Sequence, residues 1–242
     1  MFRRVRAQDV QATPERTAGI SVTWLTDGWP EDVLRGIESF RRFGGQEAQH
    51  VVVDTMSGDS DPARWPQDVE VVALEPSTGW AAARNVGLRR STGSIFLLVD
   101  GSVEATGDPF LRFVAALEDE TAGVAGPFGL VTDDLREFAE SEGPDVDAIE
   151  AYLMAFRREI LEEVGGFDER FAFYRHADLE LSFRIKDRGY RAVVVPDLPL
   201  KRHEHRRWAA TPEDERDRLS KRNFNRFLER FRGRFDLCVG PS

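Results

Sequence analysis

The sequence has almost no cysteine and no long apolar run. Its 242 residues contain one cysteine, Cys238, which excludes an intrachain disulfide and a thiolate zinc cluster and is typical of a reducing compartment. No stretch approaches the roughly 20 apolar residues of a membrane span. Residues 1–19 are polar and contain no apolar signal core. We therefore expect a cytoplasmic protein without a membrane span.

Charge is unevenly distributed along the chain. The net charge of −10 argues against a nucleic-acid binder. Residues 201–234 nevertheless hold 12 Lys/Arg against 6 Asp/Glu, so a phosphorylated ligand could be bound there. Residues 132–150 hold 8 acids and one arginine, and within them the segment 133–147 is expected to be a solvated loop. A lid over an acceptor site is the alternative function of that segment.

Short apolar runs alternate with helical patterns in the first half of the chain. This alternation predicts one α/β domain with a parallel sheet and helices on both faces. Strands are expected at 20–25, 51–54, 69–74 and 95–100, and helices at 31–43 and 79–90. Later we expect a strand at 148–156, a helix at 157–164, a strand at 191–196 and a helix at 214–232. The apolar stripe of the last helix favours docking on the core, with peripheral contact with a membrane as the alternative.

Three aspartates follow predicted strands. Asp27, Asp54 and Asp100 each stand where a strand ends, and ligands of such sheets bind at the carboxyl ends of the strands. An alternative is that each aspartate only forms the turn after its strand, which would explain any one of them taken alone. Together they predict one crevice that three carboxylates line.

A second group of functional residues is expected around Asp178. The stretch 165–184 begins with Gly-Gly-Phe-Asp-Glu, continues through a run of aromatics and leads into a helical segment. Asp178 should lie in the first turn of that helix, where free N–H groups keep a carboxylate ionised. From spacing alone a capping role is the simpler interpretation, and a general base is the alternative. Glu180 and Arg184 are spaced to pair along the helix.

These motifs, in this order, resemble family 2 glycosyltransferases, which have the GT-A fold. The similarity covers roughly residues 20–232. It includes the loop Asp54-Thr55-Met56-Ser57-Gly58-Asp59, the helix that begins Gly79-Trp80-Ala81-Ala82-Ala83-Arg84-Asn85, and the triplet Asp100-Gly101-Ser102. The chain departs from the family at Ala177, where the family has an acid, at Glu180, where it has an aspartate, and at Ser102, where it has a metal-binding aspartate.

The resemblance implies an α/β, GT-A-like (Rossmann-like) fold with a mixed, mostly parallel sheet flanked by helices in a single domain. The polar composition of the N-terminal residues predicts a flexible arm, 1–18, and the resemblance implies a glycosyltransferase domain, 19–242. Within this domain it implies a nucleotide-binding half (19–102), an acceptor and catalytic half (103–205) and a C-terminal helix (206–242).

The resemblance also implies roles for particular residues. Asp178 is the expected general base. A divalent metal, Mg²⁺ or Mn²⁺, would be held by Asp100 and His203, with His205 as the second choice of histidine; Ser102 is a poor ligand for such an ion. The residues expected to bind the donor are Thr26, Asp27, Asp54, Arg84, Asn85, Asp100 and Ser102.

The expected function is that of an inverting glycosyltransferase, which moves a sugar from a nucleotide-diphosphate donor to a hydroxyl acceptor, either a saccharide or a lipid-linked one. One alternative is a nucleotide-sugar-binding protein of the same fold with impaired catalysis, because of Ser102 and Ala177. Another is a nucleotidyltransferase. That class requires a Gly-rich, Lys-containing loop after the first strand, which residues 26–30 do not provide.

Overall fold

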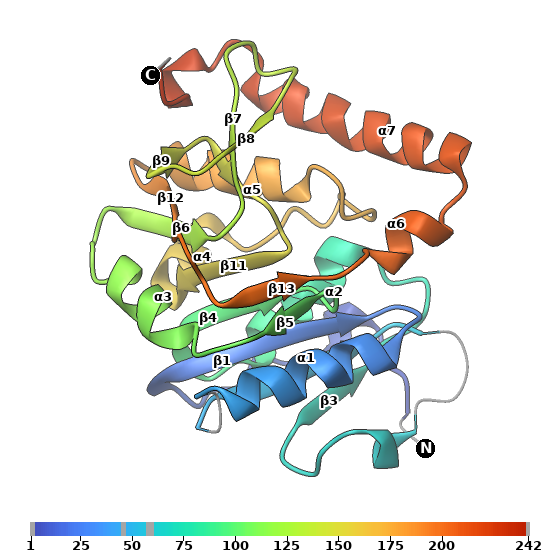
Figure 1. The fold of residues 1–242 in the computed structure, drawn as a ribbon. Coiled ribbons are helices and arrows are strands. Elements are labelled where there is room, and N and C mark those ends of the chain that lie inside the picture. Colours follow the sequence, from blue (N-terminus) through green and yellow to red (C-terminus); the bar gives the residue numbers. More distant parts are fainter. Residues whose placement is uncertain (1–2, 45–46, 57–60, 241–242) are drawn as a thin grey trace.

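An eight-stranded sheet runs through the computed structural model, which describes residues 3–44, 47–56 and 61–240. Its strand order is β3-β2-β1-β4-β11-β6-β12-β9 (Figure 1). The four neighbouring strands β3, β2, β1 and β4 are parallel to one another. Strand β11 is antiparallel to both of its neighbours, β4 and β6. These strands are β1 (Thr17–Thr26), β2 (Gln49–Asp54), β3 (Glu70–Ala73), β4 (Gly93–Val99), β6 (Ala122–Gly126), β9 (Asp145–Val146), β11 (Leu153–Arg157) and β12 (Arg191–Val194). The mixed, mostly parallel sheet is as predicted.

Helices cover both faces of the sheet, with α1 in front of it and α2 behind it in Figure 1. α1 begins with a proline, carries acids in its first turn and has arginines in its last, which suits the helix dipole. The helices are α1 (Pro30–Arg42), α2 (Trp80–Arg90), α3 (Phe110–Leu117), α4 (Arg158–Val164), α5 (Ala177–Lys186), α6 (Arg206–Ala210) and α7 (Glu213–Phe231). Short 3-10 turns are η1 (Ala7–Asp9), η2 (Pro62–Arg64) and η3 (Phe235–Leu237).

The central strand β4 is buried on both faces. Leu97 and Val99 belong to the core on the side of α1 and α3. Phe96 and Leu98 belong to the core on the side of α2, α4 and α5. Successive side chains of a strand point to opposite faces, so a strand covered on both sides needs a continuous apolar run. This explains why β4 was recognisable from the sequence.

The acidic segment differs from the solvated loop expected of it. Part of it forms a small sheet of β10 (Ala148–Ile149), β7 (Gly129–Val131) and β8 (Ala139–Ser141). Asp147 is fully buried and pairs with Lys186 Nζ at 2.9 Å. The strand predicted at 148–156 is broken into β10 and β11 by a turn at residues 150–152. A separate ribbon pairs β5 (Val103–Ala105) with β13 (Leu200–Arg202).

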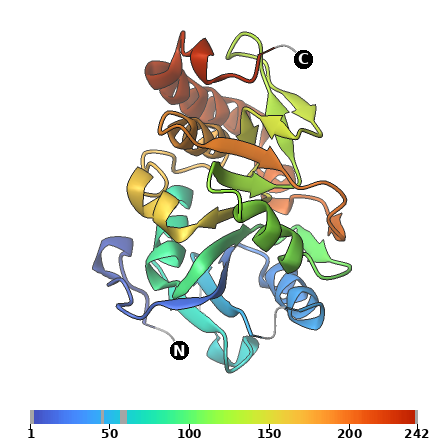
Figure 2. The ribbon, with the colours of Figure 1, turned by 90° about the vertical axis from the view of Figure 1, so that its left-hand side faces the viewer.

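Both ends of the described chain pack against the domain, as the two views in Figures 1 and 2 show. Near the N-terminus, in the segment for which a flexible arm was predicted, Val5 pairs with Leu74 beyond β3. At the other end, Phe227 of α7 lies 5.0 Å from Phe183 of α5, measured between ring centroids. The apolar stripe of α7 therefore docks on the core, as expected. Within the ranges described, no helix has the length and apolar character needed to cross a bilayer.

Replacing Phe227 tests how much this docking stabilises the protein. Phe227 is fully buried, so Phe227→Ala leaves a cavity and should lower the free energy of unfolding by about 3–5 kcal/mol. Phe235→Ala is the matched control, because Phe235 is 54% exposed, and it should cost no more than about 0.5 kcal/mol. Urea denaturation of both variants measures the difference. Equal losses would show that α7 does not dock as described.

Candidate active site

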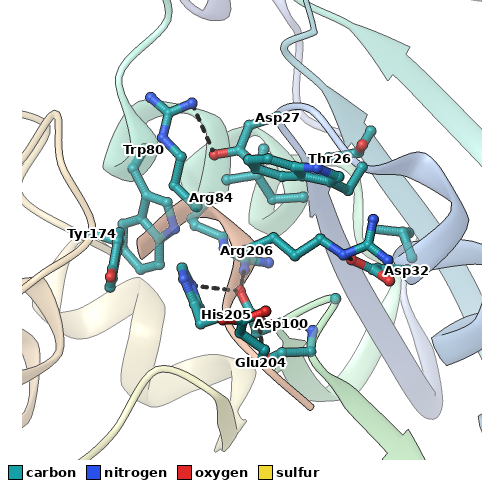
Figure 3. Close-up of a pocket in the computed structure, with 16 residues that line it drawn as sticks. Thr26, Asp27, Asp32, Trp80, Arg84, Asp100, Tyr174, Glu204, His205 and Arg206 are labelled. Carbon is teal, nitrogen blue, oxygen red and sulfur yellow. Dashed lines mark hydrogen bonds and ion pairs between the residues drawn. The ribbon is translucent and has the colours of Figure 1, made fainter. Parts of the chain in front are cut away.

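A hollow opens at the carboxyl ends of β1 and β4 (Figure 3). Thr26 is the last residue of β1 and Asp27 follows it, while Asp100 follows the last residue of β4. Because β1 and β4 are adjacent and parallel, the residues after them meet at one edge of the sheet. Five of the residues predicted to bind a donor line this first hollow: Thr26, Asp27, Arg84, Asp100 and Ser102.

Asp100 is held in its ionised form. Its Oδ1 accepts hydrogen bonds from the Ser102 amide at 2.9 Å and from the Ser102 hydroxyl at 2.6 Å. Its Oδ2 lies 3.5 Å from His205 Nε2 and 3.9 Å from Arg84 Nη2. Burial on its own raises the pKa of Asp100, but His205, Arg84 and Ser102 together lower that pKa to about 2. The carboxylate is therefore a fixed negative charge in the wall of the hollow.

The structure places His205, and not His203, beside Asp100. The Nδ1 of His205 accepts a hydrogen bond from the Trp208 amide at 3.1 Å, which caps α6 and leaves Nε2 toward Asp100. Burial lowers the pKa of His205, but the hydrogen bond and the charge of Asp100 outweigh it and raise that pKa. His203 instead contacts Glu104 at 2.6 Å and does not line the hollow. The first choice of histidine is thus corrected: β13 ends before His203, and the chain turns His205 inward.

Three arginines line the first hollow together with three aspartates, Asp27, Asp32 and Asp100. Arg84 of α2 is buried, donates to the Val99 carbonyl at 3.2 Å and stacks on Trp80 at 5.3 Å. Burial lowers the pKa of Arg84 to about 10, so the side chain stays cationic at neutral pH. Arg206 and Arg207 come from α6, and Arg207 Nη1 lies 3.7 Å from Asp27 Oδ2. Burial raises the pKa of Asp27, and Arg207 opposes that shift.

A second, smaller hollow of about 30 Å³ contains the predicted base. It shares Trp80, Asp100, Tyr174 and His205 with the first hollow, so the two are neighbours. Asp178 lies in the first turn of α5, as expected, and its carboxylate accepts from the amides of Ala151 at 3.1 Å and Leu179 at 3.0 Å. Burial raises the pKa of Asp178, and those amides only partly oppose the shift. Asp100 and Asp178 thus line one cavity.

Glu150 is a residue of this second hollow that sequence reasoning missed. It lies in the turn between β10 and β11, and its carboxylate is 3.9 Å from Arg202 Nη1. Burial, together with the charge of Asp178, raises the pKa of Glu150 to about 7. No motif includes Glu150. The signal in the sequence that could have indicated it is that an acid directly follows two apolar residues, Ala148 and Ile149, which the structure shows to be buried.

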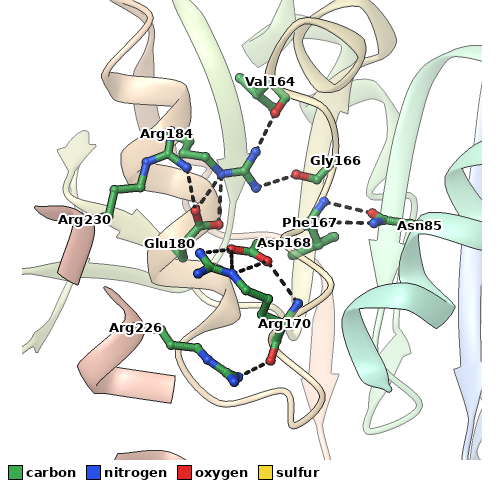
Figure 4. A network of polar contacts seen from close by, with 10 residues as sticks. All are labelled: Asn85, Val164, Gly166, Phe167, Asp168, Arg170, Glu180, Arg184, Arg226 and Arg230. Atoms are coloured by element: carbon green, nitrogen blue, oxygen red, sulfur yellow. Dashed lines mark hydrogen bonds and ion pairs between the residues drawn. The ribbon is translucent and has the colours of Figure 1, made fainter. Parts of the chain in front are cut away.

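A polar network fixes the segment that leads to Asp178 (Figure 4). Arg184 pairs with Glu180 at 2.8 Å, the pairing that the spacing predicted, and donates to the carbonyls of Val164 and Gly166. Arg230 of α7 adds a second contact to Glu180 at 3.2 Å. These bonds hold the turn after α4 against both α5 and α7.

Two residues predicted to bind the donor do not line the first hollow. Asn85 points to the Gly165–Arg170 turn, where its amide donates to the Phe167 carbonyl at 2.9 Å and accepts from the Phe167 amide at 2.8 Å. Asp54 is 2% exposed and accepts from the Met56 amide at 2.8 Å. Both side chains are therefore engaged in holding loops in this structure. Ser57 and Asp59, the other polar residues of the Asp54 motif, lie outside the described residues.

The first hollow could bind a divalent cation only with help from a ligand. In the part of the chain that the structure describes, no cluster of three or more His, Cys, Asp or Glu side chains could hold a metal ion. Asp100 supplies one potential ligand and His205 Nε2 a second, but Nε2 binds a metal only in the tautomer that gives up the Trp208 hydrogen bond at Nδ1; the Ser102 hydroxyl is occupied as a donor to Asp100. Mg²⁺ and similar ions are often held by one or two protein ligands plus substrate phosphates. The residues present fit that arrangement.

Solved structures of glycosyltransferases share this fold. The chain is similar to GalNAc-T7 with UDP, GalNAc and Mn²⁺, at 17% identity and a TM-score of 0.71, over 88% of this chain and 48% of that one. It is similar to the mannosyltransferase PcManGT from Pyrobaculum calidifontis in complex with GDP-Man and Mn²⁺, at 24% identity and a TM-score of 0.58, over 77% and 57% of the two chains. It is also similar to S. aureus TarS 1–349, at 19% identity and a TM-score of 0.57, over 91% and 75%.

The chain spans about half the length of the first two of these structures. No curated protein matches the sequence. The family model described as glycosyl transferase family 2 matches residues 30–181, which is more than half of the chain. The chain therefore belongs to glycosyl transferase family 2, and its GT-A fold agrees with that membership.

Proposed function

We propose that this glycosyltransferase moves a sugar from a nucleotide-diphosphate donor to a hydroxyl acceptor, with inversion at the anomeric carbon and Asp178 as the general base. The observation that carries the proposal is that Asp178 and Asp100 line the same hollow, although 78 positions separate them in the sequence. A donor held at Asp100 would present its anomeric carbon toward the side on which Asp178 lies.

The first hollow is the proposed site of the donor diphosphate. Arg84, Arg206 and Arg207 line it and provide cations for the phosphates, and Arg206 would exchange its present partners Glu31 and Asp32 for them. A neighbouring hollow of about 130 Å³, lined by Thr55, Pro76 and Thr78, also touches Asp27 and Trp80 and is the proposed place of the nucleoside. Asp54 and Asn85 would then support the donor site through the loops that they hold.

Transfer by single displacement needs one base and a stabilised leaving group. Asp178 takes the proton from the acceptor hydroxyl while the oxygen of that hydroxyl bonds to the anomeric carbon. At the same time the bond from the anomeric carbon to the diphosphate oxygen breaks. The negative charge then passes to the diphosphate, where Arg84, Arg206 and Arg207 stabilise it. The raised pKa of Asp178 makes it a stronger base than an ordinary aspartate.

A divalent metal fits this scheme at Asp100 and His205. Mn²⁺ or Mg²⁺ bound there with the donor would neutralise part of the charge that develops on the diphosphate. The protein residues would hold the ion against the donor, while Ser102 keeps Asp100 oriented through its two hydrogen bonds.

A nucleotide screen tests the proposal directly. Melting temperatures with UDP, GDP and dTDP, each with and without Mn²⁺, should rise for one nucleotide. Hydrolysis of the matching nucleotide sugar then distinguishes an enzyme from a binding protein with impaired catalysis, since Ser102 and Ala177 depart from the family pattern. Absence of any nucleotide effect would count against the whole proposal.

Asp178→Asn should remove transfer and leave nucleotide binding intact. An amide cannot accept the acceptor proton, so the rate of transfer should fall by about 10²- to 10⁴-fold. The melting-temperature rise with nucleotide should be unchanged, because Asp178 is not in the lining of the first hollow. Asp217→Asn, at an exposed position of α7, is the matched control and should leave the rate as it is. Retained turnover in Asp178→Asn would eliminate it as the base.

The two histidines should behave differently on substitution. His205→Ala removes the partner of Asp100 and should lower the transfer rate by about 10²-fold and raise the Mn²⁺ concentration needed for half-maximal rate. His203→Ala should change the rate little, since His203 contacts Glu104 outside the hollow. Initial rates over a MnCl₂ titration measure both effects. If His203→Ala were the more damaging variant, the assignment of His205 would be wrong.

The pH profile should report the burial of Asp178. A general base acts when ionised, so the rate falls as the pH drops through the pKa of the base. Because burial raises the pKa of Asp178 above 3.8, the acid limb of kcat/KM should have its midpoint above pH 3.8. Rates measured in overlapping buffers at constant ionic strength check this. An acid limb that follows the ordinary aspartate pKa would contradict the buried environment described.

A further inference from the structure

A third hollow adjoins Asp178 on the side of α7. Its volume is about 370 Å³, and it shares Glu150, Arg175 and Asp178 with the second hollow. Its walls come from the connection between β7 and β8 and from α7, two segments that lie close together in Figure 1. Asp178 thus stands between the proposed donor site and this hollow, which makes the hollow the place for an acceptor.

Three cations of this hollow have no carboxylate partner. Arg136, Arg175 and Lys221 line it, and no ion pair joins any of them to an acid within the ranges that the structure describes. Other arginines nearby are paired, such as Arg184 with Glu180. The Arg175 guanidinium lies over the Trp208 ring at 5.4 Å.

The acids of the hollow do not balance these cations. Glu150 already lies 3.9 Å from Arg202, and its pKa is raised to about 7, so it carries only part of a charge at neutral pH. Asp178 is the second acid, so the lining holds three cations against two carboxyl groups. The hollow therefore carries net positive charge although the whole chain carries −10.

Apolar side chains form the rest of the lining. Phe138 and Phe224 contribute aromatic rings, and Leu130 and Leu179 contribute aliphatic surface. A sugar ring can pack its apolar face on such surfaces while its charged substituent reaches the cations. Neither an aliphatic chain nor a neutral sugar would use both features.

We propose that the third hollow binds an acceptor saccharide that carries an anionic group, a phosphate or a carboxylate, and that Arg136, Arg175 and Lys221 bind this group. The inference rests on the proposed function, because the role of Asp178 identifies which hollow receives the acceptor. It adds the chemical class of the acceptor, which neither the fold nor the family defines.

The experiment compares glucose, glucose 6-phosphate and glucuronic acid as probes. Ligand-observed NMR titrations are made on the whole chain saturated with the nucleotide that gives the largest thermal shift, so that the donor site is filled. At least one anionic sugar should bind about tenfold or more tightly than glucose, and added NaCl should weaken it. Preference for glucose 6-phosphate indicates a phosphate, and preference for glucuronic acid indicates a carboxylate.

Substitutions locate the binding. Arg136→Gln and Lys221→Gln should each raise the dissociation constant of the anionic sugar by about 3- to 10-fold, since each substitution removes one positive charge from the hollow. Lys201→Gln is the matched control, because Lys201 is exposed on β13 outside the hollows. Equal binding of all three sugars, no binding of either anionic sugar, or equal effects of Lys201→Gln and Lys221→Gln would overturn the inference. Failure of every nucleotide to bind would instead overturn the proposed function.

Discussion

The turn at residues 150–152 is hydrogen-bonded to both acids on which the proposed chemistry depends, to the backbone of Asp100 and to the carboxylate of Asp178. The Tyr152 carbonyl accepts from the Asp100 amide at 2.9 Å, and the Ala151 amide donates to Asp178 at 3.1 Å. The first bond continues the pairing of β11 with β4, in which Leu153 lies opposite Val99. The antiparallel insertion of β11 beside β4 therefore sets the spatial relation between the end of β4 and the start of α5.

The carboxyl groups of the site have different pKa values because their surroundings differ. Asp100 has His205, Arg84 and Ser102 around it, and its pKa is lowered to about 2. Asp178 and Glu150 are partly buried, their desolvation is less fully compensated, and their pKa values are raised. Two kinds of carboxyl group with opposite pKa shifts in adjoining hollows are typical of sites where one acid holds charge and another moves a proton. Desolvation is the common cause, and the nearby cations decide its outcome.

Much of the fold could be predicted from the sequence because its signals were local. The continuous apolar run of β4 and the stripe of α7 each reflect one element packing on the core. The aspartates after β1 and β4 converge, as expected, because parallel strands end at one edge. The position of Asp178 in the first turn of a helix could also be predicted, whereas its role as base stays a proposal.

The remainder depended on contacts distant in sequence. Spacing could not choose between His203 and His205, because the choice depends on where β13 stops pairing with β5. Asn85 lies in a motif, yet only the tertiary structure shows that its amide holds Phe167. Glu150 was missed because a turn splits its predicted strand, and the acidic segment was misjudged because Lys186 and Arg191 supply its partners from elsewhere.

The terminal helix α7 has a consequence for how much of the chain the site requires. Asn223 is fully buried, and its side-chain amide donates to the carbonyls of Phe173 at 2.7 Å and Arg175 at 2.9 Å. The Ser220 carbonyl contacts His176 at 3.2 Å, just before α5 begins. A polypeptide that ended before residue 220 would keep Asp100, Glu150 and Asp178. It would lose the hydrogen bonds from Ser220 and Asn223 that hold the segment before Asp178 in place.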